Sequence, residues 1–219
     1  MIKKYRFAII IGVSLLCITL ITALTRKVTY SYGINYNVFQ KEIPLYVKLM
    51  EFICRDYHYQ DIVLSIVGDE KDPHKIIDRL YHYIRENVKI NKELPIVDDH
   101  PYHILVRGYG VEDQFEDIFT ILCNYAGLPA YYQQVKLNYQ TDIIQYCSFV
   151  KIDTEWTLVS VYHDLVFKDR DNRYLPIHEI KHQWHELAEA KIEIRPNFVR
   201  YKGQSLFSRI TMELNKFFR

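Results

Sequence analysis

Residues 107–130 constrain the fold more than any other stretch of this chain. They form a helical pattern that ends at a glycine and a proline, and three strand-like segments come directly after it. In RGYGVEDQFEDIFTILCNYAGLPA, residues 107–130, acidic residues precede apolar residues at helical spacing. Gly127 and Pro129 end that helix. The segments AYYQQVKL, IIQYCSFVKI and EWTLVSVY are then rich in β-branched and aromatic residues, and Asp153-Thr154 predicts a tight turn. Helices followed by a strand meander indicate an α+β fold.

A second helical pattern comes earlier in the chain. Asp72 and Pro73 form an N-cap and first-turn pair. Apolar residues then recur at helical spacing: Ile76, Ile77, Leu80, Tyr83, Ile84 and Val88. The equivalent face of the later helix is Phe115, Ile118, Phe119, Ile121, Leu122 and Tyr125. Beyond the strands we expect a helix near residues 176–190, a strand-like KIEI and a terminal helix from about Ser205.

Composition narrows the function classes. The chain has 219 residues, 49% of them apolar and 25% charged, which suits one globular domain with extensions. A net charge of +1 gives no electrostatic case for nucleic acid. The 19 tyrosines favour ordinary packing, with a groove that stacks on sugars or peptides as the alternative.

The N-terminus predicts a membrane anchor. Residues 7–24 form an uncharged apolar run near the lower length limit for crossing a bilayer. Lys3, Lys4 and Arg6 precede it and favour an N-terminus inside the cell. A cleavable signal peptide ending at Ala23 is the alternative. We expect a retained single-pass helix, with residues after about 30 outside the cytoplasm, in a bacterial inner or plasma membrane.

These patterns divide the chain into four parts. We predict an anchor at 1–28, a spacer with a helical segment at 29–71, the main domain at 72–200 and a C-terminal helix at 201–219. No CxxC motif supports a zinc ribbon or a redox site. Cys54, Cys123 and Cys147 each have apolar neighbours, which predicts small buried hydrophobic residues.

The middle of the chain resembles the transglutaminase-like (papain-like cysteine protease) superfamily. The resemblance rests on the Gly-Tyr-Gly turn at 108–110, the AGLPA helix exit, and Trp156 followed by VSVYHDLVF, and it covers about residues 72–167. It implies a core helix packed on an antiparallel sheet. It also implies a cysteine opening the helix, a histidine beginning the next strand and an aspartate ending the strand after the tryptophan.

All three groups of that triad are absent from this sequence. By the resemblance, the cysteine position falls on Glu112, the histidine position on about Gln145 and the aspartate position on Ser160. A helix N-terminus and an imidazole stabilise a thiolate, and a carboxylate fixes the imidazole tautomer. Residues 66–119 contain no Ser, Thr or Cys, and residues 131–162 contain no His. A shift of register therefore does not restore the thiol mechanism.

The same positions predict a binding cleft in place of a catalytic one. Its residues are Tyr109, Glu112, Asp113, Gln114, Gln145, Cys147, Ser160 and His163. Glu112 also suits a structural role, because negative charge is stabilised in the first turn of a helix by roughly 0.3–1 kcal/mol.

A competing motif is HEIKH, residues 178–182, which matches the H-E-x-x-H pattern of zinc hydrolases. On a helix His178 and His182 would share a face, with His185 nearby and Glu179 as a general base. Lys181 and a peripheral position weaken this interpretation, so we expect no metal or other cofactor.

The sequence thus predicts a membrane-anchored, catalytically inactive transglutaminase-like domain. We expect it to bind a peptide, a glycan or a partner protein at the cell envelope, where related domains accompany surface-polysaccharide machinery. The alternatives are a hydrolase with reassigned residues, Glu112 with Gln145, and a zinc hydrolase that uses His178 and His182 of the HEIKH segment.

Overall fold

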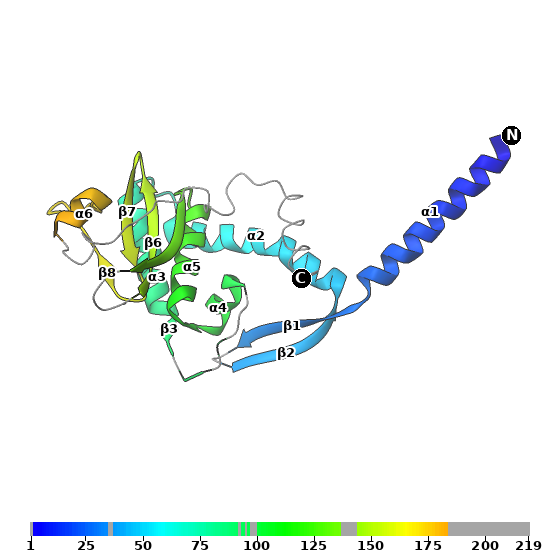
Figure 1. Cartoon of the computed structure of the whole chain (residues 1–219), viewed down its shortest axis with the longest axis horizontal. Helices are drawn as coiled ribbons and strands as arrows, with labels where there is room; N and C mark the ends of the chain where they lie inside the picture. The colour runs from blue at the N-terminus through cyan, green and yellow to red at the C-terminus, as the bar shows by residue number, and fades with distance from the viewer. Residues whose placement is uncertain are drawn as a thin grey trace.

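A computed structural model of the chain describes residues 2–34, 37–91, 93–94, 96, 100–136 and 144–183. Helix α1 (Ile2–Leu24) extends away from the rest of the protein (Figure 1). No helix among the described residues is long and apolar enough to cross a membrane.

A two-stranded hairpin follows α1. Its strands, β1 (Lys27–Ile34) and β2 (Asn37–Pro44), pair antiparallel, and the Leu45 amide donates to the Arg26 carbonyl at 2.9 Å. The sequence patterns had indicated only a spacer here. Helix α2 (Leu45–Val67) then runs back towards the main body (Figure 1).

Helix α3 (Pro73–Asn87) begins where the Asp72-Pro73 pair predicted. The Asp72 carboxylate accepts from the His74 amide at 3.0 Å, which satisfies one of the open N–H groups of the first turn. Short strands β3 (Lys89–Ile90) and β4 (Tyr109–Gly110) pair parallel. Helix α4 (Pro101–Arg107) lies between them in sequence and has Pro101 in its first turn, where the missing N–H of proline costs no hydrogen bond.

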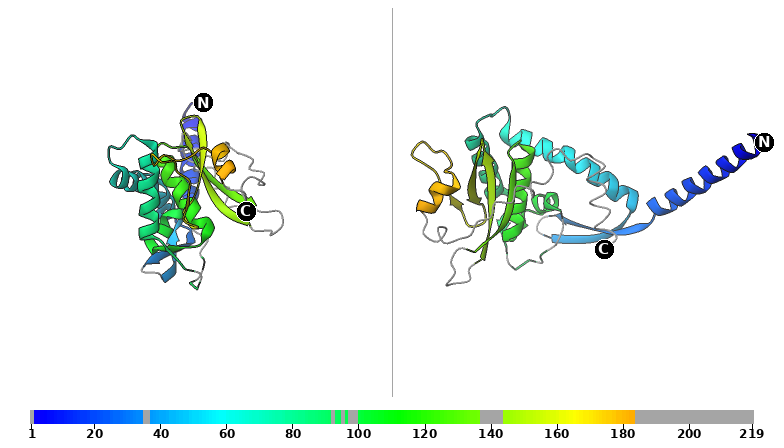
Figure 2. Two further views of the ribbon diagram at one scale, coloured as in Figure 1. Left: turned by 90° about the vertical axis from the view of Figure 1, so that its left-hand side faces the viewer. Right: turned by 45° about the horizontal axis from the view of Figure 1, so that its top comes forward.

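Helix α5 (Glu112–Tyr125) packs on a four-stranded antiparallel sheet. The sheet has the order β5 (Ala130–Lys136), β6 (Ile144–Ile152), β7 (Glu155–Ser160) and β8 (Leu165–Val166). Residue Asp153, at a φ of 52°, makes the predicted turn between β6 and β7. Helices α3 and α5 cover one face of the sheet, and the short helix α6 (Ile177–Gln183) lies on the other (Figure 2).

Two apolar clusters hold these layers together. The larger one joins α2, α3 and α5 to the sheet and includes Ile77, Leu80 and Phe119, all with 0% exposure. The smaller one lies on the opposite face and joins Phe149 and Leu158 to Ile180 of α6. The predicted apolar faces of α3 and α5 therefore lie in the larger cluster, although Tyr83 and Tyr125 are only partly buried.

The described residues confirm the α+β arrangement of a core helix on an antiparallel sheet. The three predicted strand segments match β5, β6 and β7 closely. Helix α6 ends at Gln183 within the part of the chain that is described. The rest of the helix predicted to Ala190, the KIEI strand and the helix from Ser205 lie outside the described residues.

The end of α5 is tied to the start of β5 by one buried side chain. The Asn124 amide nitrogen donates to the Ala130 carbonyl at 2.8 Å and to the Thr120 carbonyl at 2.7 Å. The Ala130 amide donates back to the Asn124 carbonyl oxygen at 3.1 Å. Asn124 therefore fixes where the chain enters the sheet after the Gly-Pro stop.

We predict that Asn124→Ala lowers the free energy of unfolding by about 2–4 kcal/mol, because it leaves buried backbone groups of Ala130 without partners. Urea unfolding measures this loss. Asn87→Ala is the matched control, because the exposed Asn87 only donates to the Tyr83 carbonyl of its own helix, and it should cost less than about 0.5 kcal/mol. Equal losses in the two variants would contradict the role of Asn124.

Candidate functional site at the start of helix α5

The Gly-Tyr-Gly turn places the start of α5. Gly108 has a φ of 72° and ends α4, with its amide donating to the Ile104 carbonyl at 2.9 Å. A Cβ atom on Gly110 would lie 3.2 Å from Ile104 Cγ2, so the Ile104 side chain would have to shift by a few tenths of an ångström to admit it. The Gln114 side-chain oxygen accepts from the Val111 amide at 3.3 Å and from the Arg107 guanidinium at 3.0 Å. The positive φ of Gly108 therefore favours glycine, and the turn leaves little room for a side chain at position 110.

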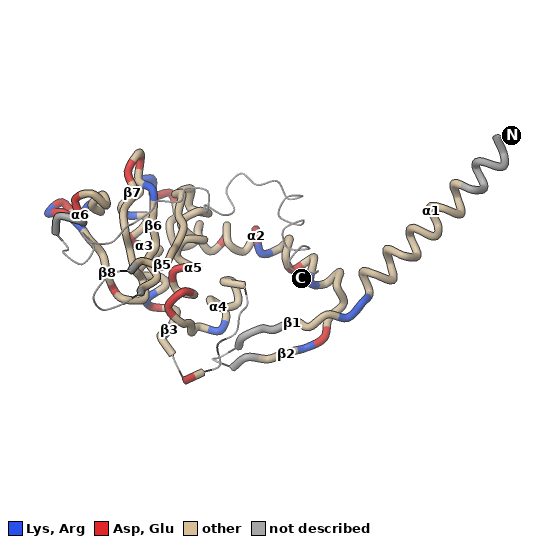
Figure 3. The backbone as a smooth tube through the Cα atoms, in the orientation of Figure 1, with Lys and Arg blue, Asp and Glu red and all other residues tan. Residues whose placement is uncertain are grey.

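Glu112 is the first residue of α5, in the acidic segment that opens this helix (Figure 3). Its Oε1 accepts from the Tyr146 amide at 2.7 Å and lies 2.9 Å from His163 Nε2. The Glu112 and His163 side chains are 28% and 26% exposed. The pair is thus partly open to solvent and lies at a helix N-terminus, where negative charge is stabilised.

The turn after β7 holds His163 in place. Arg85 of α3 donates to the Val161 carbonyl at 3.3 Å, and its Nη2 lies 3.5 Å from the Asp164 carboxylate. The Tyr81 hydroxyl donates to the same carboxylate. Asp164 has a φ of 58°, so the chain reverses directly after His163. Helix α3 thereby positions the imidazole over the start of α5.

This geometry determines which imidazole nitrogen is available. An ionised carboxylate only accepts hydrogen bonds, so Nε2 of His163 carries the proton that Glu112 accepts. In the neutral tautomer Nδ1 is then the acceptor. The pair can therefore bind a ligand that donates hydrogen bonds, and it has the arrangement in which a carboxylate orients a histidine base.

A second carboxylate lies one helical turn further along α5 and is fully buried. Glu116 accepts from the Ser148 hydroxyl at 2.5 Å, the Ser160 hydroxyl at 2.9 Å and the Tyr162 amide at 3.1 Å. Burial raises the pKa of Glu116 to about 7, although these donors favour the charged form and oppose the increase. Glu116 thus joins α5 to β6 and to the end of β7.

The side chains at the three predicted triad positions, Glu112, Gln145 and Ser160, do not contact one another through any hydrogen bond among the described residues. Ser160 binds Glu116, one turn along the helix from Glu112. The side-chain oxygen of Gln145 is buried without a hydrogen-bond partner among the described residues. The hydrogen bonds of Glu112 come from Tyr146 and His163, so the expected group of Glu112, Gln145 and Ser160 is replaced by Glu112 with His163.

Three other predicted cleft residues are buried. Tyr109 and Cys147 are 2% and 0% exposed, and Gln114 lies under the turn at 9%. These three side chains are therefore not available to a ligand at the surface. Asp113, which follows Glu112, is partly exposed.

The described thiols offer no accessible nucleophile at this site. Burial raises the pKa values of the Cys123 and Cys147 thiols, and the Glu116 and Glu112 carboxylates add to the increase for Cys147. Cys54 was predicted to be buried, but it is exposed on α2, since it faces away from the core.

Sequence reasoning missed Glu116 and Tyr146. Glu116 lies among the acidic residues that open the helix, yet it stands one residue after Phe115 and three before Phe119, which is the helical spacing of the packed face. The Tyr146 contact uses a backbone amide, so no side-chain pattern could reveal it.

The HEIKH segment is only partly described. His178 is 65% exposed, and its Nδ1 lies 3.8 Å from the Glu155 carboxylate. No group of three potential metal ligands occurs among the residues that the structure describes. The side chain of His182 and the whole of His185 lie outside those residues, so the zinc hypothesis is untested.

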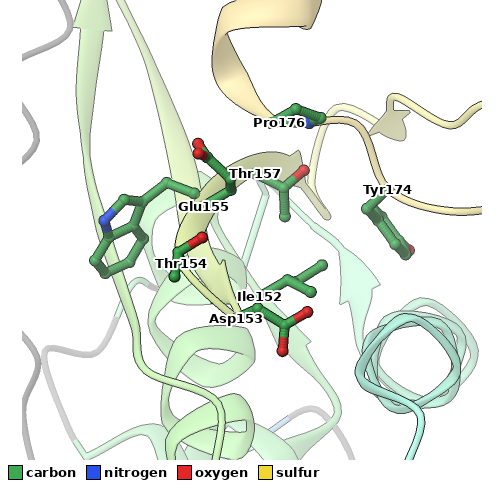
Figure 4. Close-up of a pocket in the computed structure, with 8 residues that line it drawn as sticks. Ile152, Asp153, Thr154, Glu155, Thr157, Tyr174 and Pro176 are labelled. Carbon is green, nitrogen blue, oxygen red and sulfur yellow. The ribbon is translucent and has the colours of Figure 1, made fainter.

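A small pocket of about 220 Å³ lies at the opposite end of β7 from Ser160 (Figure 4). The turn between β6 and β7 forms one wall, and Tyr174 and Pro176 form the other. Thr157 contributes a buried hydroxyl that has no partner among the described residues. The pocket shares no lining residue with the site at the start of α5.

Comparison with known proteins identifies the family. A family model described as the transglutaminase-like superfamily matches residues 60–191, which is more than half of the chain. The chain belongs to the transglutaminase-like superfamily. The match begins inside α2, whereas the sequence patterns had placed the domain at 72–200. No curated protein matches the chain.

The solved structures that are similar to this chain are distant from it in sequence. A protein designated a cysteine protease from Cytophaga hutchinsonii has 17% identity and a TM-score of 0.44, and the match covers 51% of this chain and 39% of that protein. A protein designated a protease from Parabacteroides distasonis has 16% identity and a TM-score of 0.40, with 48% and 23% covered. A TGase has 10% identity and a TM-score of 0.38, with 65% and 45% covered. The match covers less than half of each of these proteins.

The buried carboxylate predicts a pH dependence of stability. A pKa raised from 4.5 to about 7 means that folded Glu116 keeps its proton over a range where the unfolded chain has lost it. Its contribution to stability is therefore fully present below about pH 4.5 and is lost as pH rises to about 7. We expect the stability difference between wild type and Glu116→Gln to change by about 2–4 kcal/mol between pH 4.5 and 7.5, in the direction that disfavours wild type. Urea unfolding of both proteins across this range measures it, and a difference independent of pH would contradict the raised pKa.

Proposed function

We propose that this transglutaminase-like domain is non-catalytic and binds a ligand at the start of α5. The observation that supports the proposal is that Glu112 occupies the first position of the helix and is bonded to the Tyr146 amide and to His163. A thiolate nucleophile would need that position, because the helix N-terminus lowers a thiol pKa there. A carboxylate already stabilised by two donors has little tendency to act as a nucleophile or base.

The same geometry suggests the class of ligand. Glu112 uses Oε1 in both of its contacts, so Oε2 has acceptor capacity for a donor from outside. His163 adds a second acceptor through Nδ1. Amide N–H groups of a peptide and hydroxyl groups of a glycan both fit this pattern, as does the backbone of a partner protein.

One specific contact favours a second candidate function. The 2.9 Å contact between Glu112 and His163 matches the arrangement in which a carboxylate orients an imidazole that activates water. In that case the domain is a hydrolase with reassigned residues, and His163 is the general base. This candidate keeps Glu112 from the hydrolase alternative that the sequence predicted, and His163 takes the place of Gln145 as its partner.

The Glu112 position can be tested by restoring a thiol. In a chain with Cys17→Ser and Cys54→Ser, we predict that Glu112→Cys reacts with iodoacetamide at pH 7 at least about 10-fold faster than Asp113→Cys, because only the first thiol lies beside His163 at the helix start. Asp113→Cys is matched in helix position and charge change. Adding Gln145→His tests whether an imidazole at that position increases the rate further.

The assay for turnover uses the unmodified chain with amide and ester substrates. The proposal predicts no turnover. Turnover that is lost in both Glu112→Gln and His163→Gln would overturn it in favour of the hydrolase. Equal thiol reactivity at residues 112 and 113 would show that the start of α5 does not have the assigned geometry.

We further propose, from the sequence, that the apolar segment at residues 7–24 anchors the domain to a bacterial envelope membrane, with the domain outside the cytoplasm and accessory to surface-polysaccharide machinery. The uncharged sequence of residues 7–24 supports the anchor. Apolar side chains along α1, including Ile9 at 64% and Leu16 at 69%, are exposed, and α1 points away from the domain (Figure 1).

A C-terminal fusion tests this topology. We predict that alkaline phosphatase, which is active only outside the cytoplasm, is active when it is fused after Arg219. Green fluorescent protein exported in the same way should stay dark. Bright fluorescence with an inactive phosphatase would contradict the proposed orientation.

A further inference from the structure

The pocket of about 220 Å³ at the tip of β6 and β7 is separate from the site at the start of α5. Residues of the β6–β7 turn, of β7 and of the segment before α6 line it. Asp153 and Thr157 lie on one side of the pocket, and Tyr174 lies on the other (Figure 4). The walls therefore combine charged, polar and aromatic groups.

One polar group in the wall of this pocket has no partner. Thr157 is 2% exposed, and its hydroxyl makes no hydrogen bond with any described residue. In Figure 4 this hydroxyl points towards Tyr174 and Pro176, on the other side of the pocket. A buried hydroxyl without a partner is costly, and a ligand that donates a hydrogen bond to it would offset that cost.

The charges around the pocket indicate the charge of that ligand. The eight residues that line it include the carboxylates of Asp153 and Glu155 and no basic side chain. Two basic groups nearby already contact acidic partners, because Lys168 Nζ lies 2.6 Å from Asp78. Similarly, His178 Nδ1 lies 3.8 Å from Glu155. The pocket therefore favours a cation that donates hydrogen bonds.

The positions of the acceptors favour a guanidinium over an ammonium group. Asp153 is exposed at the rim, whereas Thr157 is buried, so the two acceptors lie at different depths. A guanidinium offers five N–H donors in a planar fork, whereas an ammonium is a compact and strongly hydrated point charge. Ile152 and Pro176 provide apolar surface for an alkyl chain.

We propose that this pocket binds a guanidinium group carried on a short alkyl chain. The Asp153 carboxylate supplies the opposite charge, the Thr157 hydroxyl accepts a hydrogen bond, and Glu155 adds negative charge at the entrance. An arginine side chain of a peptide and a free alkylguanidine share this chemistry.

Two conservative substitutions test the pocket without disturbing the fold. Asp153 has a φ of 52°, and asparagine tolerates this left-handed region, so Asp153→Asn removes the charge and keeps the turn. Thr157→Val replaces the hydroxyl by a methyl group. Its urea midpoint should be no lower than that of wild type, because the hydroxyl that it removes has no partner.

The probe is Nα-acetyl-arginine methylamide, titrated into the full chain. NMR of ¹³C-labelled threonine follows the methyl groups of Thr154 and Thr157, which line the pocket. We expect both resonances to shift with this probe. The citrulline analogue, a neutral isostere of arginine, should leave them unchanged.

The variants should change the affinity selectively. Asp153→Asn should weaken binding at least about 10-fold, and Thr157→Val about 3- to 10-fold, read at Thr154. Asp69→Asn removes the same charge at an exposed position that does not line the pocket, and it should leave the affinity unchanged. Glu112→Gln should also have no effect, which separates this pocket from the site at the start of α5.

Several results would overturn the proposal. An absence of shifts with the arginine probe means that the pocket does not bind this group. Equal affinity for the citrulline analogue excludes a role for charge, and equal affinity for the lysine analogue excludes selection of the guanidinium. Equal weakening in Asp153→Asn and Asp69→Asn means that only the net charge of the protein matters.

Agmatine, a free alkylguanidine, distinguishes the two sources of the ligand. Tighter binding of agmatine than of the arginine amide assigns the pocket to a free small molecule. The reverse order assigns it to arginine within a peptide, and both results support the guanidinium site.

Discussion

The Glu116 carboxylate is the interaction on which the rest of the site depends. It is fully buried and accepts hydrogen bonds from Ser148 of β6, from Ser160 at the end of β7 and from the Tyr162 amide in the following turn. Removing this group would leave two buried hydroxyls and an amide without their acceptor. One side chain thereby sets the distance between helix α5 and two strands.

The hydrogen bonds of Glu116 also position His163, which is partly exposed to solvent. Tyr162 directly precedes His163, and its amide donates to the Glu116 carboxylate. Glu116 therefore fixes the start of the turn that carries the His163 imidazole. The side chains of Tyr81 and Arg85 bind the same turn at Asp164 and at the Val161 carbonyl. Two carboxylates one helical turn apart consequently have different roles: Glu116 organises the packing, and Glu112 with His163 is available to a ligand.

The sequence predicted the packing better than the site. Periodicity identified the buried faces of α3 and α5, and the Gly-Pro stop and the Asp153-Thr154 turn located the sheet, because these signals depend on local chemistry. The partnership of Glu112 with His163 joins residues 51 positions apart and follows from the turn after β7, which local patterns do not encode. Cys54 is a similar case, since its apolar neighbours predicted burial, whereas it lies on the exposed side of α2.

The role of the buried Glu116 can be measured by following its side-chain carboxyl carbon by NMR through a pH titration. With ¹³C-labelled glutamate, Glu116→Gln assigns the resonance. We expect a titration midpoint near 7, because the effect of burial on the pKa outweighs that of the hydrogen-bond donors. A midpoint near the ordinary value of 4.5 would mean that the carboxylate is solvated and that α5 is not held to β6 and β7 in this way.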